Sequence, residues 1–217
     1  MKDLKEYISQ LRYDFSKQTL DESEVNTNPI IQFESWFKEA VEAQVLSPNA
    51  MVVSTASKDA VTTARVLLLR NFDEKGFVFY TNHNSKKGNQ IDHNPHVALT
   101  FFWPELERQI RIEGTVDKQT DEESDEYFVV RPEGSKLGAW ASQQSSVVES
   151  RAVMDAKFKE MQNHFRGKEI PRPAFWGGYL VKPTMFEFWQ GRPNRFHDRI
   201  AYVQDENRNW EIERLSP

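Results

Sequence analysis

The feature that most constrains this fold is the pattern from residue 51 to residue 117, where β-branched and aromatic runs alternate with polar turns. The runs occupy residues 51–57, 61–70, 77–81, 96–103 and 107–117. Before residue 50 the apolar spacing is helical, whereas after it the runs are typical of strands. The intervening segments Lys-Asp-Ala and Asp-Glu-Lys-Gly are typical turns. We therefore predict an antiparallel meander.

Helical patterns flank this meander. Pro29 opens a predicted helix, and its apolar stripe, expected in the core, consists of Phe33, Trp36, Phe37, Ala40 and Val41. Further helices are predicted over 85–94, 121–130 and 146–165, and further strands over 178–182, 185–189, 196–204 and 210–214. The predicted fold class is α+β, an antiparallel β-barrel with peripheral helices. Because no long linker divides the chain, we expect residues 1–217 to form a single domain.

Residues 1–28 are expected to form an N-terminal helix and a polar loop. Leu4, Ile8, Leu11 and Phe15 follow one another at spacings of four, three and four residues, which is typical of a short amphipathic helix. This helix either docks on the body of the protein or acts as a mobile flap. The sequence leaves both possibilities open.

Charge and composition narrow the possible functions. A formal net charge of −5 argues against a nucleic-acid or membrane-surface binder, so any basic site must be local. The absence of Cys excludes disulfides, thiolate metal sites and cysteine nucleophiles. The five His residues lack metal-site spacing, so no metal is expected. The chain shows neither a signal peptide nor an apolar run long enough to cross a membrane, and we expect a soluble, cytoplasmic protein.

The stretch from Glu187 to Arg199 combines an aromatic residue with a row of cations. If a strand follows the Gly-Arg-Pro-Asn turn, Arg195, His197 and Arg199 lie on one of its faces. Cations on one face repel one another unless an anion lies against them. Together with the flat ring of Trp189, they suit a flat anionic ligand such as a phosphorylated cofactor. An exposed hairpin with a basic, solvated side is the alternative, and both stay open here.

A polar loop that runs into a predicted helix is a candidate phosphate site. Tyr80 and Thr81 end a strand, Ser85 is a predicted N-cap, and Lys86 and Lys87 follow in the first helical turn. Lysines at the positive end of a helix are unfavourable unless an anion binds there. We therefore favour phosphate binding over an ordinary loop with surface lysines.

A second group of candidate donors lies near residue 130. Tyr127, Arg131 and Ser135 offer a phenol, a guanidinium and a hydroxyl, all of which can donate to phosphate oxygens. The same residues are also typical of a helix end. Residues 138–146 also offer amide and hydroxyl donors, and the alternative to ligand binding there is a helix cap. The predicted strand 65–70 has an Arg at each end, and the alternative to ligand binding there is that both ends are simply solvated.

Several short motifs follow one another along the chain. They are Arg-Val-Leu-Leu-Leu-Arg (65–70), Phe-Tyr-Thr-Asn (79–82), Leu-Glu-Arg-Gln (106–109), Tyr-Phe-x-x-Arg-Pro (127–132), Gly-Ala-Trp-Ala-Ser-x-Gln-Ser-Ser (138–146), Phe-Trp-Gly-Gly-Tyr (175–179), Phe-Trp-Gln-Gly (188–191) and Arg-Phe-His-Asp-Arg (195–199). In this order they resemble the pyridoxine/pyridoxamine 5′-phosphate oxidase family, and the likeness covers nearly the whole chain.

The resemblance implies an FMN-binding split β-barrel that forms a homodimer with FMN at the subunit interface. It also implies the oxidation of pyridoxamine or pyridoxine 5′-phosphate to pyridoxal 5′-phosphate, with oxygen as electron acceptor and hydrogen peroxide as product. A hydride would pass from the substrate C4′ carbon to flavin N5. The rival functions are a flavin reductase of the same fold and a non-catalytic carrier of FMN or pyridoxal phosphate.

The resemblance also implies roles for individual residues. The implied FMN-binding residues are Arg65, Val66, Leu67, Leu68, Leu69, Arg70, Tyr80, Thr81, Lys86, Lys87, Gln109, Gln144, Ser145, Trp189 and Arg199. The implied substrate-binding residues are Arg70, Tyr127, Arg131, Ser135, Arg195, Phe196 and His197. Of these, Arg195 and His197 match residues that lie over the substrate ring, and they are the expected catalytic pair.

The chain departs from the family pattern at three positions. Arg70 stands where Lys is common, and Lys86 stands where Arg is common. Both changes keep the charge but alter the hydrogen-bond geometry. Phe15 stands where Tyr is usual, which weakens the expectation that residues 12–15 contact the substrate.

Overall fold

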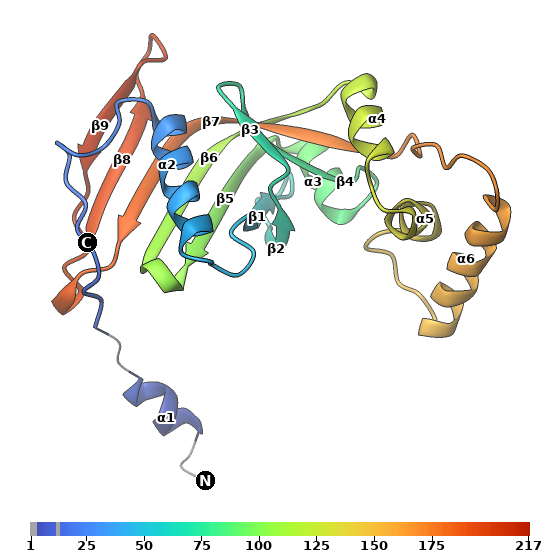
Figure 1. Ribbon diagram of the computed structural model, residues 1–217, viewed down its shortest axis with the longest axis horizontal. Helices are drawn as coiled ribbons and strands as arrows, with labels where there is room; N and C mark the ends of the chain where they lie inside the picture. Colours follow the sequence, from blue (N-terminus) through green and yellow to red (C-terminus); the bar gives the residue numbers. More distant parts are fainter. Residues whose placement is uncertain (1–3, 12–13) are drawn as a thin grey trace. The chain divides into compact units, whose positions relative to one another are not determined.

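The computed structural model describes residues 4–11 and 14–217 (Figure 1). These residues fall into two compact units. The first unit contains the described residues up to Pro48 together with Phe101–Arg111 and Met185–Pro217. The second contains Asn49–Thr100 and Ile112–Thr184. The strands β5 (His96–Trp103), β6 (Arg108–Lys118) and β7 (Trp176–Gln190) contribute residues to both. A single domain over 1–217 stays a prediction.

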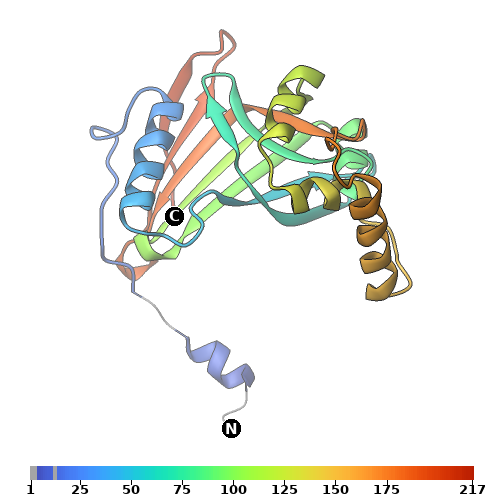
Figure 2. The ribbon, with the colours of Figure 1, turned by 45° about the vertical axis from the view of Figure 1, so that its right-hand side comes forward.

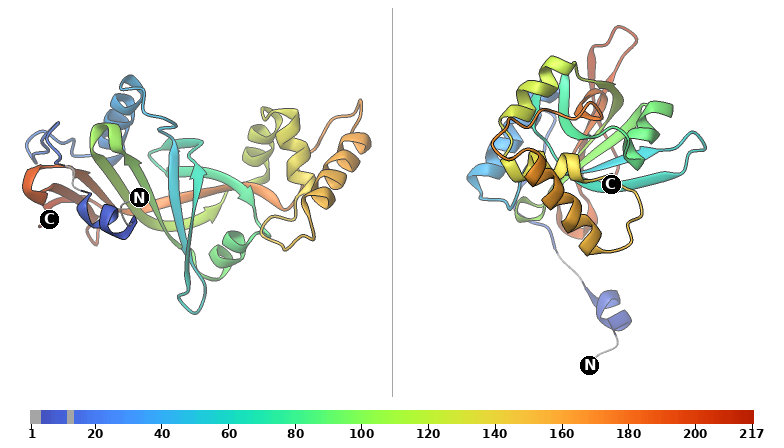
Figure 3. Two further views of the ribbon diagram at one scale, coloured as in Figure 1. Left: turned by 90° about the horizontal axis from the view of Figure 1, so that it is seen from below. Right: turned by 90° about the vertical axis from the view of Figure 1, so that its right-hand side faces the viewer.

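The second unit is built on antiparallel strands. Besides parts of β5, β6 and β7 it contains β1 (Ala50–Ala56), β2 (Thr62–Leu68), β3 (Asn71–Asp73) and β4 (Gly76–Asn82). The sheet order is β2-β1-β5-β6-β7-β4-β3, and the pairs β1–β2, β1–β5, β3–β4 and β4–β7 are antiparallel, as predicted. Figure 3 shows β1 and β2 as a long hairpin. Val53, Phe79, Leu99 and Tyr179 are fully buried in the core of this unit.

The helices of the second unit are α3 (Lys86–His93), α4 (Asp121–Val129), α5 (Glu133–Ala141) and α6 (Arg151–His164). In α4, Thr120 and Glu123 form a capping box, which explains why the helix starts there. Helix α5 was not predicted, and the predicted helix 146–165 corresponds to the shorter α6. Two glycines, Gly134 and Gly138, lower the helix propensity of α5 and hide it in the sequence.

The first unit packs helix α2 (Pro29–Glu42) on a sheet made of the end of β7, β8 (Asp198–Gln204) and β9 (Trp210–Arg214), and Figure 2 shows the helix beside these strands. Trp36 meets Phe188 with ring centroids 5.2 Å apart, and Phe33 meets Phe101 at 5.2 Å. Of the predicted stripe, Phe33, Trp36 and Ala40 are core, Phe37 is half-buried, and Val41 is 53% exposed. The unit also contains α1 (Leu4–Gln10), η1 (Pro104–Leu106) and η2 (Pro193–Arg195).

Two predicted strands differ from the observed ones. The predicted strands 178–182 and 185–189 form one continuous strand, β7, in which the Thr184 hydroxyl donates to the Glu113 carbonyl at 3.3 Å. The predicted strand 196–204 begins only at Asp198. Pro193 opens a 3₁₀ turn, and Asn194 and Arg195 take left-handed backbone angles (φ 57° and 59°), so strand alternation cannot start before the turn ends. Among the described helices, none is both long and apolar enough to cross a membrane.

Candidate functional site

Lys87 lies at the centre of a buried polar cluster in the second unit. The residue is 6% exposed, and its Nζ donates to Thr81 Oγ1 at 3.0 Å, Ser85 Oγ at 3.3 Å and Gln144 Oε1 at 2.9 Å. All three acceptors are neutral. Burial, followed by repulsion from Arg65, lowers the pKa of Lys87 to about 8. A buried ammonium that lacks a counter-charge is unfavourable, so the cluster suits an anionic ligand.

Arg65 adds a second cation, and hydrogen bonds fix the orientation of its guanidinium group. Its Nη1 donates to the Val53 carbonyl at 2.9 Å and to Thr55 Oγ1 at 2.8 Å, and its Nη2 donates to Thr63 Oγ1. Gln90 Oε1 accepts from Thr55 at 2.6 Å and from Thr63 at 2.7 Å, which orients both hydroxyls. Burial lowers the pKa of Arg65. Because its partners are neutral oxygens, the guanidinium keeps its charge available for a ligand.

The cluster lies at the N-terminus of α3. Ser85 caps the helix by accepting the Gly88 N–H, as predicted. A Cβ at Gly88 would lie 1.8 Å from the His83 carbonyl oxygen, so only glycine lets the loop close on the helix. A hollow of about 680 Å³ opens here, with Asn84, Lys86, Gln144 and Ser145 in its lining. Helix N–H groups and flanking cations are the elements of a phosphate site.

The segment 66–70, which was predicted to bind FMN, directly follows Arg65 in the sequence. Val66 and Leu68 are exposed (65% and 38%), whereas Leu69 is buried and Leu67 is half-buried. Arg70 follows the end of β2, is exposed, and donates its backbone N–H to the Val78 carbonyl at 2.9 Å.

A stack of aromatic rings forms a second cluster in the same unit. Tyr80 and Tyr127 stack with centroids 3.8 Å apart, and Tyr80 and Trp176 stack at 5.4 Å. The Arg131 Cζ lies 4.2 Å from the centroid of the Trp176 ring. Burial raises the pKa of Tyr80 to about 12, so this phenol stays protonated and can donate. The stack therefore contains two of the predicted substrate residues, Tyr127 and Arg131.

Arg131 is a cation without a described carboxylate partner. Its Nη1 is buried and has no hydrogen-bond partner within the described residues. Burial lowers the pKa of Arg131, Tyr127 opposes this shift, and repulsion from Arg70 adds to it. Ser135 lies further along the chain, in the first turn of α5, and is exposed. Two mutually repelling arginines beside a helix N-terminus and a hydroxyl are suited to a second anion.

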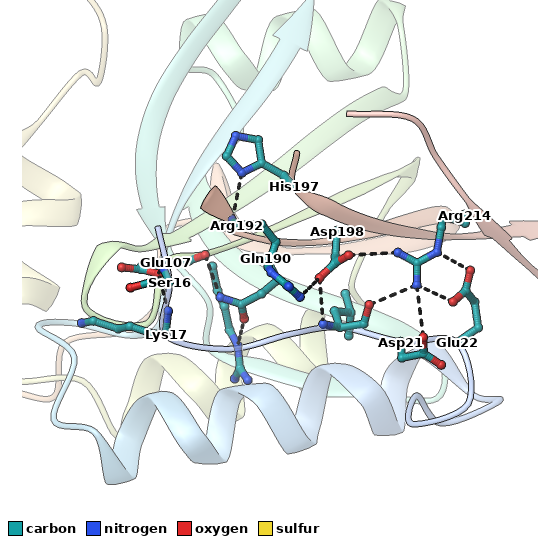
Figure 4. Close-up of polar contacts among 12 residues, drawn as sticks. Ser16, Lys17, Asp21, Glu22, Glu107, Gln190, Arg192, His197, Asp198 and Arg214 are labelled. Atoms are coloured by element: carbon teal, nitrogen blue, oxygen red, sulfur yellow. Dashed lines mark hydrogen bonds and ion pairs between the residues drawn. The ribbon is translucent and has the colours of Figure 1, made fainter. Parts of the chain in front are cut away.

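Trp189 and His197 form a ring cluster in the first unit. Their centroids lie 4.6 Å apart, and the Phe15 ring meets both edge-on at 5.5 Å. The Arg192 N–H donates to His197 Nδ1 at 3.1 Å (Figure 4), so the neutral ring carries its proton on Nε2. Burial, followed by repulsion from Arg195, lowers the pKa of His197, which favours this neutral ring at pH 7.

The predicted row of three cations on one strand face is wrong. Arg195 lies in η2 and His197 precedes β8, so only Arg199 belongs to the strand. Arg199 pairs in register with Trp189, and its Nε donates to Glu187 Oε1 at 2.8 Å. Glu187 is 3% exposed and also accepts from Arg111 at 2.9 Å. The anion that Arg199 requires is therefore supplied by the protein.

The remaining predicted residues of the first unit are less constrained. Gln109 is half-buried on β6, and Phe196 is 76% exposed. Of the residues 12–15, residues 12 and 13 lie outside the described part of the chain. No group of three or more His, Asp or Glu in the described ranges could hold a metal ion.

Sequence reasoning missed two residues of these clusters, Trp176 and Glu187. Trp176 was part of a quoted motif, and the two glycines after it were the signal of a close approach. A Cβ at Gly178 would lie 2.0 Å from Gln119 Oε1, and one at Gly177 would lie 3.0 Å from Ser124 Oγ. Glu187, between Phe186 and Phe188, was visible as a carboxylate inside an apolar strand.

Comparisons with known proteins identify the family. A family model described as Pyridoxamine 5′-phosphate oxidase matches residues 37–165, and one described as Pyridoxine 5′-phosphate oxidase C-terminal dimerisation region matches residues 176–217. A protein of Cyanothece sp. named pyridoxine/pyridoxamine 5′-phosphate oxidase is 50% identical over 210 residues, covering 97% of this chain and 98% of its own length. The chain belongs to the pyridoxamine 5′-phosphate oxidase family.

Solved structures show the same fold. PhzG from Burkholderia lata 383, in complex with tetrahydrophenazine-1-carboxylic acid, is 28% identical with a TM-score of 0.86, covering 92% of this chain and 98% of its own. A pyridoxamine 5′-phosphate oxidase-related, FMN-binding protein from Nostoc punctiforme is 15% identical with a TM-score of 0.67, covering 85% of this chain and 97% of its own. The fold is the α+β, antiparallel split barrel, as predicted.

FMN is the cofactor, as the resemblance implied. The donor set of the second unit fits its phosphate, since the buried Lys87 and the half-buried Arg65 have only neutral partners. The match to a dimerisation region supports the predicted homodimer. The family is one of oxidase-type enzymes.

Proposed function

We propose that this protein oxidises pyridoxamine 5′-phosphate and pyridoxine 5′-phosphate to pyridoxal 5′-phosphate, as a cytoplasmic homodimer with FMN at the subunit interface. The observation that carries the proposal is the presence of two separate cation clusters without described carboxylate partners. One contains Lys87 and Arg65, and the other contains Arg131 and Arg70. A phosphorylated cofactor and a phosphorylated substrate require two such clusters.

In this proposal Lys87, Arg65 and the N-terminus of α3 bind the FMN phosphate. Lys86, Gln144 and Ser145 line the adjoining hollow. Tyr80, Thr81, Gln109, Trp189, Arg199 and the segment 66–70 complete the FMN-binding set. Lys87 has only neutral partners, so no existing ion pair has to break when phosphate binds. Because Lys87 is already buried, its new ion pair with the phosphate forms in a desolvated site.

The substrate phosphate is assigned to Arg70, Tyr127, Arg131 and Ser135. The Arg131 guanidinium is held flat on Trp176, which leaves its buried, unpartnered Nη1 to donate. Arg195, Phe196 and His197 are assigned to the substrate ring. With Nδ1 engaged by Arg192, His197 can donate from Nε2 to an acceptor on the ring, and Arg195 can stabilise negative charge there.

When bound, FMN supplies the electron acceptor: a hydride leaves the substrate C4′ carbon, and oxygen finally takes the two electrons and two protons to become hydrogen peroxide. With the amine substrate, water adds to the resulting imine and ammonia leaves. The residues of the chain bind and orient the two ligands, which agrees with the absence of an assigned acid–base pair of carboxylates.

The experiment uses the FMN-loaded protein without oxygen. Adding pyridoxamine 5′-phosphate should bleach the flavin absorbance, and admitting air should restore it with release of pyridoxal 5′-phosphate and hydrogen peroxide. A flavin spectrum that this substrate leaves unchanged would overturn the proposal.

PhzG, whose structure holds a phenazine carboxylic acid, raises a second candidate, a tricyclic substrate that carries no phosphate. Such a substrate would not need the Arg131 cluster. The rates of flavin reduction by pyridoxamine and by its 5′-phosphate separate the two candidates. A phosphate-independent rate would favour the second one, whereas a strong preference for the phosphate ester supports the first.

A further inference from the structure

Arg172 joins two elements of the second unit with all three guanidinium nitrogens. Its Nε donates to Asp125 Oδ1 at 2.6 Å, its Nη2 donates to Asp121 Oδ1 at 2.6 Å, and its Nη1 donates to the Trp176 carbonyl at 2.8 Å. The two aspartates lie one turn apart on α4, and Trp176 begins β7. A planar fork can satisfy three acceptors in fixed directions, which an ammonium cannot.

The two elements that Arg172 joins carry the ring stack. Tyr127 belongs to α4, and Arg131 follows the end of this helix. Both belong to the stack around Trp176: the Tyr127 and Trp176 rings are parallel to within 6° with centroids 6.3 Å apart, and the Arg131 guanidinium lies 4.2 Å over the Trp176 ring. The position of α4 relative to Trp176 therefore sets where the Tyr127 hydroxyl and the Arg131 guanidinium lie.

The ion pairs of Arg172 are expected to contribute more to the position of α4 than to the stability of the fold. The Arg172 side chain is only 8% exposed, but the side chains of Asp121 and Asp125 are 84% and 58% exposed. Ion pairs to exposed carboxylates contribute little to stability. The helix retains other anchors, since Thr120 caps it and the Ser124 hydroxyl accepts the Gly178 N–H at 3.2 Å. Loss of Arg172 should therefore leave the unit folded while loosening the stack.

We propose that Arg172 is a positioning residue for phosphate recognition, holding α4 against Trp176 so that Tyr127 and Arg131 present their donors at a fixed spacing. This inference rests on the proposed function, in which these two residues bind the substrate phosphate. It concerns recognition of a phosphate monoester, and Arg172 itself does not touch the substrate.

The test compares Arg172→Ala and Arg172→Lys with the wild type, all loaded with FMN. We expect KM for pyridoxamine 5′-phosphate to rise about tenfold in both variants while kcat stays within about twofold, because only binding of the remote phosphate is weakened. The second readout is the ratio of the Kd for pyridoxal to the Kd for pyridoxal 5′-phosphate. This ratio should fall by the same factor, which a general loss of stability would not cause.

Arg151→Ala is the matched control, because Arg151 pairs with Asp155 on the exposed face of α6 and should change neither readout. If Arg172→Ala does not fold, the double variant Asp121→Ala/Asp125→Ala removes the two contacts to α4 and keeps the arginine and its bond to the Trp176 carbonyl. An unchanged KM and an unchanged Kd ratio in variants of an active wild type would overturn the inference. A wild type that does not oxidise the substrate would instead overturn the proposed function, and the Kd ratio then still decides the role of Arg172.

Discussion

At the scale of the residue, Lys87 shows how burial can prepare a site for an anion. Its three neutral partners hold the ammonium in place without neutralising it, and burial, followed by repulsion from Arg65, lowers its pKa to about 8. The sequence predicted the anion site from two lysines and an N-cap. It did not predict that Lys87 is buried whereas Lys86 is exposed, because the partners of Lys87 include Gln144, which is 57 residues away in sequence.

The lowered pKa of Lys87 makes FMN binding depend on pH. Below about pH 8 the free protein already carries the Lys87 proton, so this group adds no pH dependence. Above this pH the free protein must take up a proton to bind the phosphate, so the Kd for FMN should rise by about tenfold per pH unit. The Kd can be measured between about pH 6.5 and 9.5 by adding FMN to the FMN-free protein and following the quenching of flavin fluorescence.

Lys87→Arg is the control, because an arginine stays protonated throughout this range. Its Kd should be nearly independent of pH. Equal pH profiles for the variant and the wild type would show that another group is responsible.

At the scale of the element, residues 16–20 are tied to other elements of the first unit by two carboxylate acceptors. Glu107, 1% exposed, accepts the N–H groups of Ser16 and Lys17 at 2.8 and 3.0 Å, and Asp198 accepts the Leu20 N–H at 3.1 Å (Figure 4). The sequence left open whether residues 1–28 dock or act as a flap. These bonds show that residues 16–20 are docked, whereas the mobility of the whole segment stays a prediction.

Replacing Glu107 by Gln should weaken this attachment. The two N–H bonds lose their ionised acceptor, and the free energy of unfolding should fall by about 1 kcal/mol. Unfolding in urea measures this change. Glu105→Gln, on the exposed side of the same turn, should stay within about 0.5 kcal/mol of the wild type. Equal losses in both variants would contradict a specific role for Glu107.

At the scale of the whole molecule, cofactor binding and stability are linked. A ligand that binds only the folded protein stabilises it by mass action, by about 2.7 kcal/mol at a hundredfold excess over its Kd. FMN at such an excess should therefore raise the melting temperature. Riboflavin, which lacks the phosphate, should raise it much less at the same concentration, because it cannot pair with Lys87 and Arg65. Thermal unfolding followed by circular dichroism distinguishes them, and equal shifts would argue against the phosphate site.

The sequence by itself determined the class of fold, the family and most of the candidate residues. The change of period at residue 50, the helix cap at Ser85 and the ordered motifs are local signals, and the structure contains the predicted strands and the Ser85 cap. Helix α5 escaped prediction because its glycines weaken a local signal that tertiary packing overrides.

Only the tertiary structure decided which charges are neutralised. Arg199 looked like part of a free cationic row but pairs with the buried Glu187, which also binds Arg111 from 76 residues away. Arg131 looked like a helix end but lies on Trp176, and Arg172 reaches back about a quarter of the chain to hold α4. Periodicity reports the face on which a side chain lies. Its counter-charge comes from segments distant in sequence, and only folding brings these together.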